Sequence, residues 1–351
     1  MKKLSSSIIL VNVLLIFSLI LAGCSSQPAS EPAKPAAPEQ ANPAAPAQTE
    51  APSAPSEPAK SEEPVEQGKP EAGAATGEKV LRMINFQAPV TLNVHLSPGN
   101  KDSEASRLIV EPLAAYDENG QPVPILAEEI PTLENGGISE DLITTTWHLK
   151  KDVKWSDGTD FTADDVVFTW QYIMNPEVGS VSVGSYSAIE NIEAVDPHTA
   201  VITWKQPNSE PLIAFAALYG PIIQKKQFEP FNNSSASQSP ANLAPIGTGP
   251  FMVVEAIPGD TFVYVKNPLY RNADKVYFDK VILKGGGDAA TAARAVVQTG
   301  EFDYAFNLGI EKEVLENLNA NGDKGQIYTK LTSQTNRIAF NLTNPDPALG
   351  E

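Results

Sequence analysis

The stretch that decides the fold runs from Thr146 to Phe168 and reads T-W-H-L-K-K-D-V-K-W-S-D-G-T-D-F-T-A-D-D-V-V-F. Just before and at its start, every second residue faces one side of the chain: Ile143, Thr145, Trp147 and Leu149 alternate with the polar Thr144, Thr146, His148 and Lys150. Alternation with a period of two is typical of a strand that is buried on one face only. The start of the stretch therefore predicts a half-buried β-strand.

A turn and a helix follow this strand. Asp157-Gly158 predicts the turn. Thr162 suits a helix N-cap, and Asp164 and Asp165 then lie in the first turn, where the helix dipole favours anions and acidic residues usually face solvent. Asn175-Pro176 ends the helix. One apolar face results, made of Val166, Val167, Trp170, Ile173 and Met174.

Further elements of both kinds are expected on either side. A short strand is predicted over 81–86 and a helix over 107–113, before a turn at Asn119-Gly120. Later strands are predicted over 199–204 and 281–283, and a hairpin about Pro258-Gly259-Asp260 joins strands at 251–255 and 261–266. A helix follows over 289–298, and a last strand is expected over 336–341. The fold class is therefore α/β, and the four tryptophans within these elements are expected in the core.

The N-terminal residues predict an export signal. Lys2 and Lys3 precede an apolar run over 8–21, and the run ends at Leu21-Ala22-Gly23-Cys24. The apolar run is too short for a membrane span of about 20 residues, and small residues precede a cleavage point, as in a secretory signal peptide. Leu-Ala-Gly-Cys resembles the bacterial lipobox, whose cysteine is acylated. Cys24 is the only cysteine, so we expect it to be lipidated and to anchor the exported chain to the cell membrane.

Residues 25–77 are rich in proline, alanine and glutamate and contain no aromatic residue. Such a composition cannot bury enough apolar area to offset the loss of chain entropy on folding. We expect a disordered tether of residues 24–78 that holds a folded body some 40 Å from the membrane, on the order of 5–6 Å times the square root of the residue number.

Charge and composition argue against several function classes. The formal net charge of −18 repels nucleic acid. The histidines at 95, 148 and 198 lack the spacing of a metal site, and no nucleophile motif occurs. Gly247-Thr248-Gly249-Pro250 lacks the lysine of a phosphate loop and predicts a turn, whereas Gly285–Gly287 predicts a flexible crossing between lobes. We expect no enzymatic activity, no cofactor, no metal and no nucleic-acid partner.

The stretch from Thr146 to Phe168 closely resembles the signature of solute-binding protein family 5, the dipeptide, oligopeptide and nickel binders of ABC importers. Other segments that resemble the family occur in the family's order and with its spacing. They are Leu92-Asn93-Val94-His95, Pro124-Ile125-Leu126-Ala127-Glu128, Ile246 to Phe251, Asn267-Pro268-Leu269-Tyr270 and Gly300-Glu301-Phe302-Asp303.

The resemblance implies a periplasmic-binding-protein-like fold in which two lobes close on a ligand, with an extra domain inserted. After the signal peptide at 1–23, domain I would comprise 79–108 and 195–284, domain II 109–194, and domain III would start at 285. Family members continue far beyond the position of Glu351. We therefore expect a C-terminally truncated product, or a partial sequence, with an incomplete second lobe and weak ligand binding or none.

The resemblance also implies candidate ligand contacts. The loop Pro98-Gly99-Asn100-Lys101 matches the family segment that adds main-chain hydrogen bonds to a bound peptide as a strand would. Tyr186 and Tyr219 are further candidates, and each of these residues is alternatively a surface turn or a core aromatic. The strongest anchor for a peptide in this family lies beyond Glu351.

The expected function is the capture of short peptides outside the cell and their delivery to ABC permease subunits. Two alternatives stay open. The same fold could bind another solute, such as a nickel chelate or an oligosaccharide. Alternatively, the truncated body is a lipoprotein with an adhesion or sensing role and no part in transport.

Overall fold

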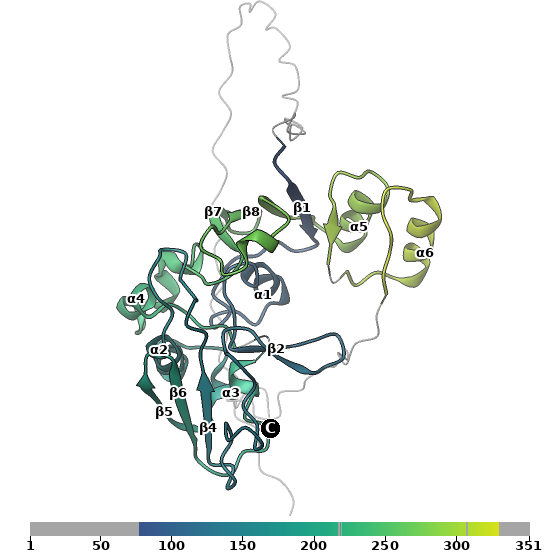
Figure 1. Cartoon of the computed structure of the whole chain (residues 1–351). Helices are drawn as coiled ribbons and strands as arrows, with labels where there is room; N and C mark the ends of the chain where they lie inside the picture. The colour runs from purple at the N-terminus through teal and green to yellow at the C-terminus, as the bar shows by residue number, and fades with distance from the viewer. Residues whose placement is uncertain (1–76, 217, 219, 307, 330–351) are drawn as a thin grey trace, which may run out of the picture. The chain divides into compact units, whose positions relative to one another are not determined.

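A computed structural model describes residues 77–216, 218, 220–306 and 308–329 (Figure 1). Cys24, the tether up to residue 76, Tyr219 and the strand expected over 336–341 lie outside the described residues. The described part mixes helices and strands, as the α/β prediction requires.

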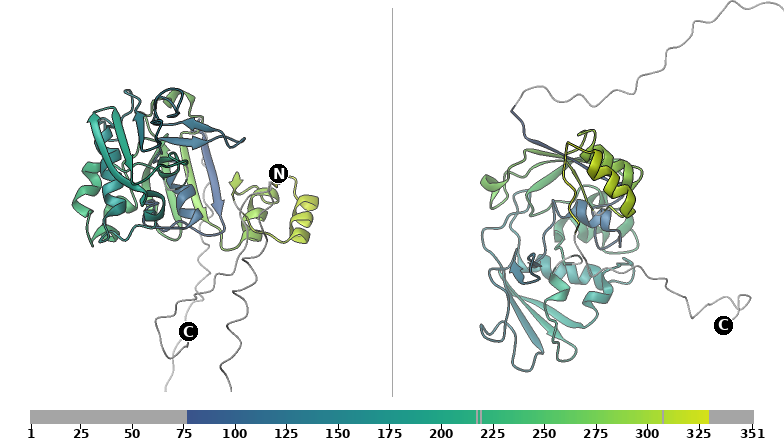
Figure 2. Two further views of the ribbon diagram at one scale, coloured as in Figure 1. Left: turned by 90° about the horizontal axis from the view of Figure 1, so that it is seen from below. Right: turned by 90° about the vertical axis from the view of Figure 1, so that its right-hand side faces the viewer.

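The larger sheet joins the start of the described chain to segments about 200 residues later. Its strand order is β10-β1-β9-β8-β7, and Figure 2 shows β1, in blue, beside the green strands. β1 is parallel to both β9 and β10, so the carboxyl ends of these three strands lie at one edge of the sheet. The strands are β1 (Val80–Asn85), β7 (Phe251–Ile257), β8 (Thr261–Lys266), β9 (Lys280–Gly285) and β10 (Tyr304–Ala305).

Helix α1 (Asn100–Ser106) packs on this sheet. Ala105 of α1 and Ile109 beyond it are fully buried against Phe262, Tyr264 and Leu283. The Tyr264 hydroxyl donates a hydrogen bond to the Ala105 carbonyl over 3.3 Å.

The helix predicted over 107–113 is wrong, because the helix lies one to two turns earlier. Beyond Ser106 the backbone bonds to another segment: the carbonyls of Leu108 and Ile109 accept from the N–H groups of Phe251 and Gly249. Apolar spacing alone did not reveal that these carbonyls have partners outside a helix.

Two helices near the end of the described chain pack together. They are α5 (Ala289–Val297), which also contacts Ile84 of β1, and α6 (Lys312–Asn321). Asp288 caps α5 by accepting a hydrogen bond from the Thr291 N–H over 2.8 Å. The helix predicted over 289–298 is thereby confirmed.

A second, three-stranded sheet contains the strand of the predicted strand-turn-helix motif. Its order is β4-β6-β5, all antiparallel, and helix α2 lies against it (Figure 1). Thr145, Trp147 and Leu149 are fully buried, as their alternation predicts. The elements are β4 (Thr144–His148), α2 (Ala163–Met174), β5 (Ile189–Asp196) and β6 (Thr199–Trp204).

The expected limit between domains II and I, at 194/195, falls within β5 of this sheet. The domain limits stay predictions. A two-stranded hairpin, β2 (Ala114–Tyr116) and β3 (Pro122–Pro124), surrounds the predicted turn at Asn119-Gly120. The remaining helices are short: α3 (Val183–Tyr186), α4 (Lys225–Phe228), η1 (Ile213–Phe215), η3 (Glu229–Phe231), η4 (Ala236–Gln238), η5 (Pro240–Asn242) and η6 (Ala273–Lys275).

Candidate functional site

A pocket of about 200 Å³ opens at the edge where the parallel strands end. Asn85 ends β1, and Phe306 directly follows β10. Helix α1 and the residue before it supply the other wall. In open α/β sheets, ligands bind outside the carboxyl ends of the strands. The lining residues are Asn85, Phe86, Gln87, Gly99, Asn100, Lys101, Glu104 and Phe306.

A charged pair, Arg82 and Asp303, links β1 to the residue before β10. Arg82 donates from Nη2 to Asp303 Oδ1 over 2.8 Å and from Nε to Oδ2 over 3.1 Å, and its backbone N–H reaches Oδ2 over 2.8 Å. Partial burial opposes ionisation of Asp303, but the hydrogen bonds and the charge of Arg82 together lower its pKa. Asp303 directly precedes β10, so the pair supports the pairing of β10 with β1, and Phe306 follows that strand.

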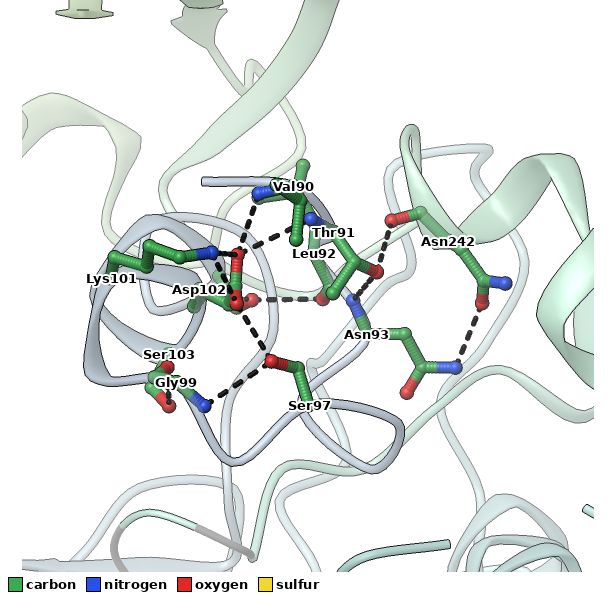
Figure 3. Close-up of polar contacts among 11 residues, drawn as sticks. Val90, Thr91, Leu92, Asn93, Ser97, Gly99, Lys101, Asp102, Ser103 and Asn242 are labelled. Atoms are coloured by element: carbon green, nitrogen blue, oxygen red, sulfur yellow. Dashed lines mark hydrogen bonds and ion pairs between the residues drawn. The ribbon is translucent and has the colours of Figure 1, made fainter. Parts of the chain in front are cut away.

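The wall at Gly99 to Lys101 is organised by one buried carboxylate, that of Asp102, which is 1% exposed. Asp102 lies in the first turn of α1, and Figure 3 shows its carboxylate among side chains and N–H groups of residues 90–101. Its oxygens accept hydrogen bonds from the N–H groups of Val90 and Thr91 over 2.7 and 3.3 Å, and from the Ser97 hydroxyl over 2.7 Å. The Lys101 ammonium lies 3.0 and 2.9 Å from the two oxygens. Asp102 thus fixes the path of residues 90–101.

The structure places three of the four predicted loop residues on the pocket. Gly99, Asn100 and Lys101 line it, whereas Pro98 is exposed and does not. Strand-like pairing by Gly99 does not fit this conformation, since its N–H donates to Ser97 Oγ and its carbonyl accepts from the N–H groups of Asp102 and Ser103. Contact of these residues with a ligand stays a prediction.

The segment Leu92 to His95 joins the loop to more distant parts of the chain. The Asn93 amide donates to Asn242 Oδ1 over 2.9 Å. His95 is fully buried, with Nδ1 3.0 Å from Ser182 Oγ and Nε2 2.9 Å from the Pro221 carbonyl. Burial lowers the pKa of His95 to about 4, although the hydrogen bond to Pro221 acts in the opposite direction. His95 is therefore a neutral structural residue near neutral pH.

The stretch from Trp155 to Asp165 also has a structural role. Asp165 accepts hydrogen bonds from the Trp155 indole, the Thr162 N–H and the Lys225 N–H over 3.1, 3.1 and 2.9 Å. Thr162 and Asp165 form the reciprocal capping box of α2. The expectation that Asp165 is a surface residue is wrong, because it is 6% exposed, and burial raises its pKa despite these hydrogen bonds.

Asp157, in the predicted turn, ties the same motif to a later segment. Partial burial opposes ionisation, but hydrogen bonds from Thr159, Gln224 and Lys226 lower the pKa of Asp157 to about 2. Gln224 Nε2 donates over 3.2 Å, and Lys226 Nζ lies 3.2 Å from Oδ2. The strand-turn-helix motif is thus linked by hydrogen bonds to the segment around Gln224 and Lys226. None of its residues lines the pocket.

Two glycine segments allow close backbone approach. A Cβ on Gly249 would lie 2.6 Å from the Ile109 carbonyl oxygen, and Gly249 donates its N–H to the same oxygen over 2.7 Å. In the predicted crossing, Gly285 packs against Ala88 and Gly286 against Ile84, whereas Gly287 has a φ of +82°. Both glycine segments are positioned by packing, and neither forms part of the pocket lining.

Of the two predicted tyrosines, the structure describes Tyr186, which does not line the pocket. Tyr186 is fully buried, with its ring 5.1 Å from that of Phe215 in an edge-to-face arrangement, and burial raises its pKa. This position gives Tyr186 a packing role, the alternative left open for it. Tyr219 lies outside the described residues.

Sequence reasoning missed Asn85, Phe86, Gln87, Glu104 and Phe306 as lining residues. One signal was available for three of them, because Asn85 lies in the last part of the predicted strand as well. Phe86 and Gln87 lie at the end of the strand predicted over 81–86, where an α/β fold places ligands. Glu104 and Phe306 carried no local signal, because their place depends on α1 and on the distant pairing of β10 with β1.

Comparison with known proteins identifies similar chains. Residues 121–349 match the model of "Bacterial extracellular solute-binding proteins, family 5 Middle". The periplasmic oligopeptide-binding protein OppA of Escherichia coli is 28% identical over 257 residues, which are 67% of this chain and 45% of OppA. The chain thus spans less than half the length of this relative.

Two solved structures have a similar fold. NikZ from Campylobacter jejuni, in complex with Ni(L-His), has a TM-score of 0.56 and 28% identity, covering 64% of this chain and 43% of NikZ. MoaA from A. tumefaciens R10, in complex with mannopinic acid, has a TM-score of 0.59 and 27% identity, covering 70% of this chain and 48% of MoaA.

Proposed function

We propose, because the chain belongs to the bacterial extracellular solute-binding proteins of family 5, that it captures short peptides outside the cytoplasm and delivers them to the permease of an ABC importer. The main observation in support of solute binding is the pocket at the carboxyl ends of β1 and β10. Its volume of about 200 Å³ is below the roughly 300–1,000 Å³ of complete small-molecule sites. The pocket therefore holds one part of a solute.

The chemistry of the lining supports a peptide. Asn85, Gln87 and Asn100 carry side-chain amides, which both donate and accept hydrogen bonds and so match the N–H and C=O groups of a peptide. Phe86 and Phe306 add apolar surface. Each hydrogen bond contributes only about 0.5–1.5 kcal/mol net, so we expect affinity to be built from several of them. OppA, named for oligopeptide binding, is among the similar chains.

A second candidate is a different small solute. The similar structures NikZ and MoaA hold a nickel–histidine complex and mannopinic acid. Within the described residues, no group of three or more His, Cys, Asp or Glu side chains is placed to hold a metal ion. Nickel would therefore need to arrive as a chelate that brings its own ligands. A sensing or adhesion role without transport is the remaining alternative.

The class of solute is tested by titrating the chain with four ligands in a calorimeter, each up to millimolar concentration. The ligands are tri-alanine, alanyl-lysyl-alanine, a nickel–histidine complex and maltotriose. Our proposal expects heat from at least one peptide and none from the last two. Binding of the nickel complex or the sugar, with no peptide bound, would replace the peptide assignment with the second candidate.

We propose that the chain is held at the membrane through acyl chains on Cys24. No helix among the described residues is long and apolar enough to cross a membrane. Two acyl chains give stable anchoring where one is marginal. In cells that express the full chain, Cys24→Ala should move it from the membrane fraction to the soluble fraction and abolish labelling by radioactive palmitate, whereas the neighbouring Ser25→Ala should not. Equal membrane retention of all three proteins would refute the anchor.

A further inference from the structure

Glu104 supplies a negative charge to the pocket that has no strong partner within the described chain. The other charged residue of the lining is Lys101, whose ammonium contacts both oxygens of Asp102 at 3.0 and 2.9 Å. The charges of Lys101 and Asp102 therefore offset each other. Glu104 keeps its charge at the pocket, and its side chain is 26% exposed.

The cation nearest to Glu104 holds it weakly. Arg107 Nη1 lies 3.5 Å from Glu104 Oε1, and the Arg107 side chain is 56% exposed. A single ion pair at such exposure is easily exchanged with water or another cation. The 26% exposure of its side chain shows that the Glu104 carboxylate is partly removed from water. This burial raises the pKa of Glu104, against the smaller effect of Arg107. A carboxylate in that position gains more from a cation that enters the pocket than one in bulk water does.

The surroundings of Glu104 suit an organic cation. Phe86 and Phe306 line the same pocket, and aromatic rings attract ammonium and guanidinium groups while also covering their alkyl parts. Apart from Glu104 and the paired Lys101, the polar side chains of the lining are neutral amides. The pKa of Tyr304 is raised first by partial burial and then by the charge of Glu104, so Tyr304 lies within reach of that charge. The net charge of −18 also favours the approach of cations.

We propose that Glu104 makes this pocket a subsite for the amine or guanidinium group of a cationic solute. The proposal rests on the solute-binding function proposed above and gives that function a substrate class, solutes with a positively charged side chain such as lysine- or arginine-containing peptides.

The test compares the affinities of the full chain for alanyl-lysyl-alanine, tri-alanine and alanyl-glutamyl-alanine by calorimetry. We expect the lysine peptide to bind about tenfold more tightly than tri-alanine, a difference of about 1.4 kcal/mol. Glu104→Gln should remove this preference. Glu134→Gln, which removes the same charge from an exposed site elsewhere, should retain it. Arg107→Gln should strengthen binding of the lysine peptide, because it removes the competing cation.

A second probe separates this proposal from the peptide assignment. L-argininamide carries the cation without a peptide chain, and its binding is followed by the change in amide resonances of residues 85–87 and 99–104. Peptides that bind without regard to charge, in wild type and Glu104→Gln alike, would overturn the subsite and leave the transport function. Binding of L-argininamide that depends on Glu104, with no peptide bound, would support the subsite and overturn the peptide assignment. Absence of binding by all four probes would overturn both.

Discussion

The guanidinium of Arg271 donates two hydrogen bonds, 2.7 and 2.8 Å long, to the carboxylate of Glu111, which lies 160 residues earlier in the chain. Both side chains are less than a tenth exposed. The pair joins the segment after α1 to the segment after β8. A buried ion pair of this kind is costly to break, since the remaining charge has no partner and no water.

We expect Glu111→Gln to reduce the free energy of unfolding by about 3–5 kcal/mol. Urea denaturation followed by tryptophan fluorescence measures this change. Lys312→Gln is the matched control, because its pair with Glu316 is highly exposed and should contribute under about 1 kcal/mol. A double variant that replaces both partners by apolar residues, Glu111→Leu with Arg271→Met, should recover most of the loss. Equal small effects of Glu111→Gln and Lys312→Gln would contradict the role of the buried pair.

His95 makes the stability of the folded part depend on pH. Its pKa is about 4 in the folded chain and about 6.5 in the unfolded chain. Between these values the unfolded chain binds more protons, so stability rises with pH. The contribution is fully present above about pH 6.5 and is lost as the pH falls toward 4, at most about 3 kcal/mol.

Unfolding free energies measured between pH 4 and pH 7 test this prediction. His95→Gln should show a shallower dependence on pH than the wild type and lower stability at pH 7, because Gln cannot reproduce both ring contacts. His148→Gln is the control, since His148 is exposed, and its profile should follow that of the wild type. Parallel profiles for wild type and His95→Gln would show that His95 is not the source of the dependence.

Gly249 lies where a side chain has no room. Its substitution by alanine would place a Cβ 2.6 Å from the Ile109 carbonyl oxygen, so the two segments would have to separate. We expect Gly249→Ala to cost about 1–3 kcal/mol of stability, the usual range for overpacking. A Cβ added at Gly184 would meet no atom within 4 Å, so Gly184→Ala should leave the melting temperature unchanged or slightly raised. Equal melting temperatures for both variants would contradict the close approach.

Local chemistry explains what could be predicted from the sequence. The strand before Trp155, the turn at Asp157 and the helix capped by Thr162 each depend on neighbouring residues, and all three are present. By contrast, β5 was missed because two register shifts, between Ile189 and Asn191 and between Ala194 and Asp196, break the alternation of buried and exposed residues.

The pocket could be predicted only in part for a related reason. The segment from Gly99 to Lys101 was found through the family resemblance, but its expected loop conformation is wrong for Asn100 and Lys101, which begin helix α1. Its conformation depends on Asp102, whose partners Val90 and Thr91 lie 12 and 11 residues earlier. Phe306 reaches the pocket only because β10 pairs with β1, about 220 residues earlier. No local pattern carries information about pairing over such a distance.

The measurement that tests the central claim most directly is amide hydrogen exchange of the full chain, with and without millimolar alanyl-lysyl-alanine. The claim is that solute enters the pocket at the carboxyl ends of β1 and β10. It predicts slower exchange confined to residues 85–88, 99–104 and 305–306, with the sheet β4-β6-β5 unchanged. Protection centred on that smaller sheet, or no change anywhere at saturating peptide, would contradict the claim.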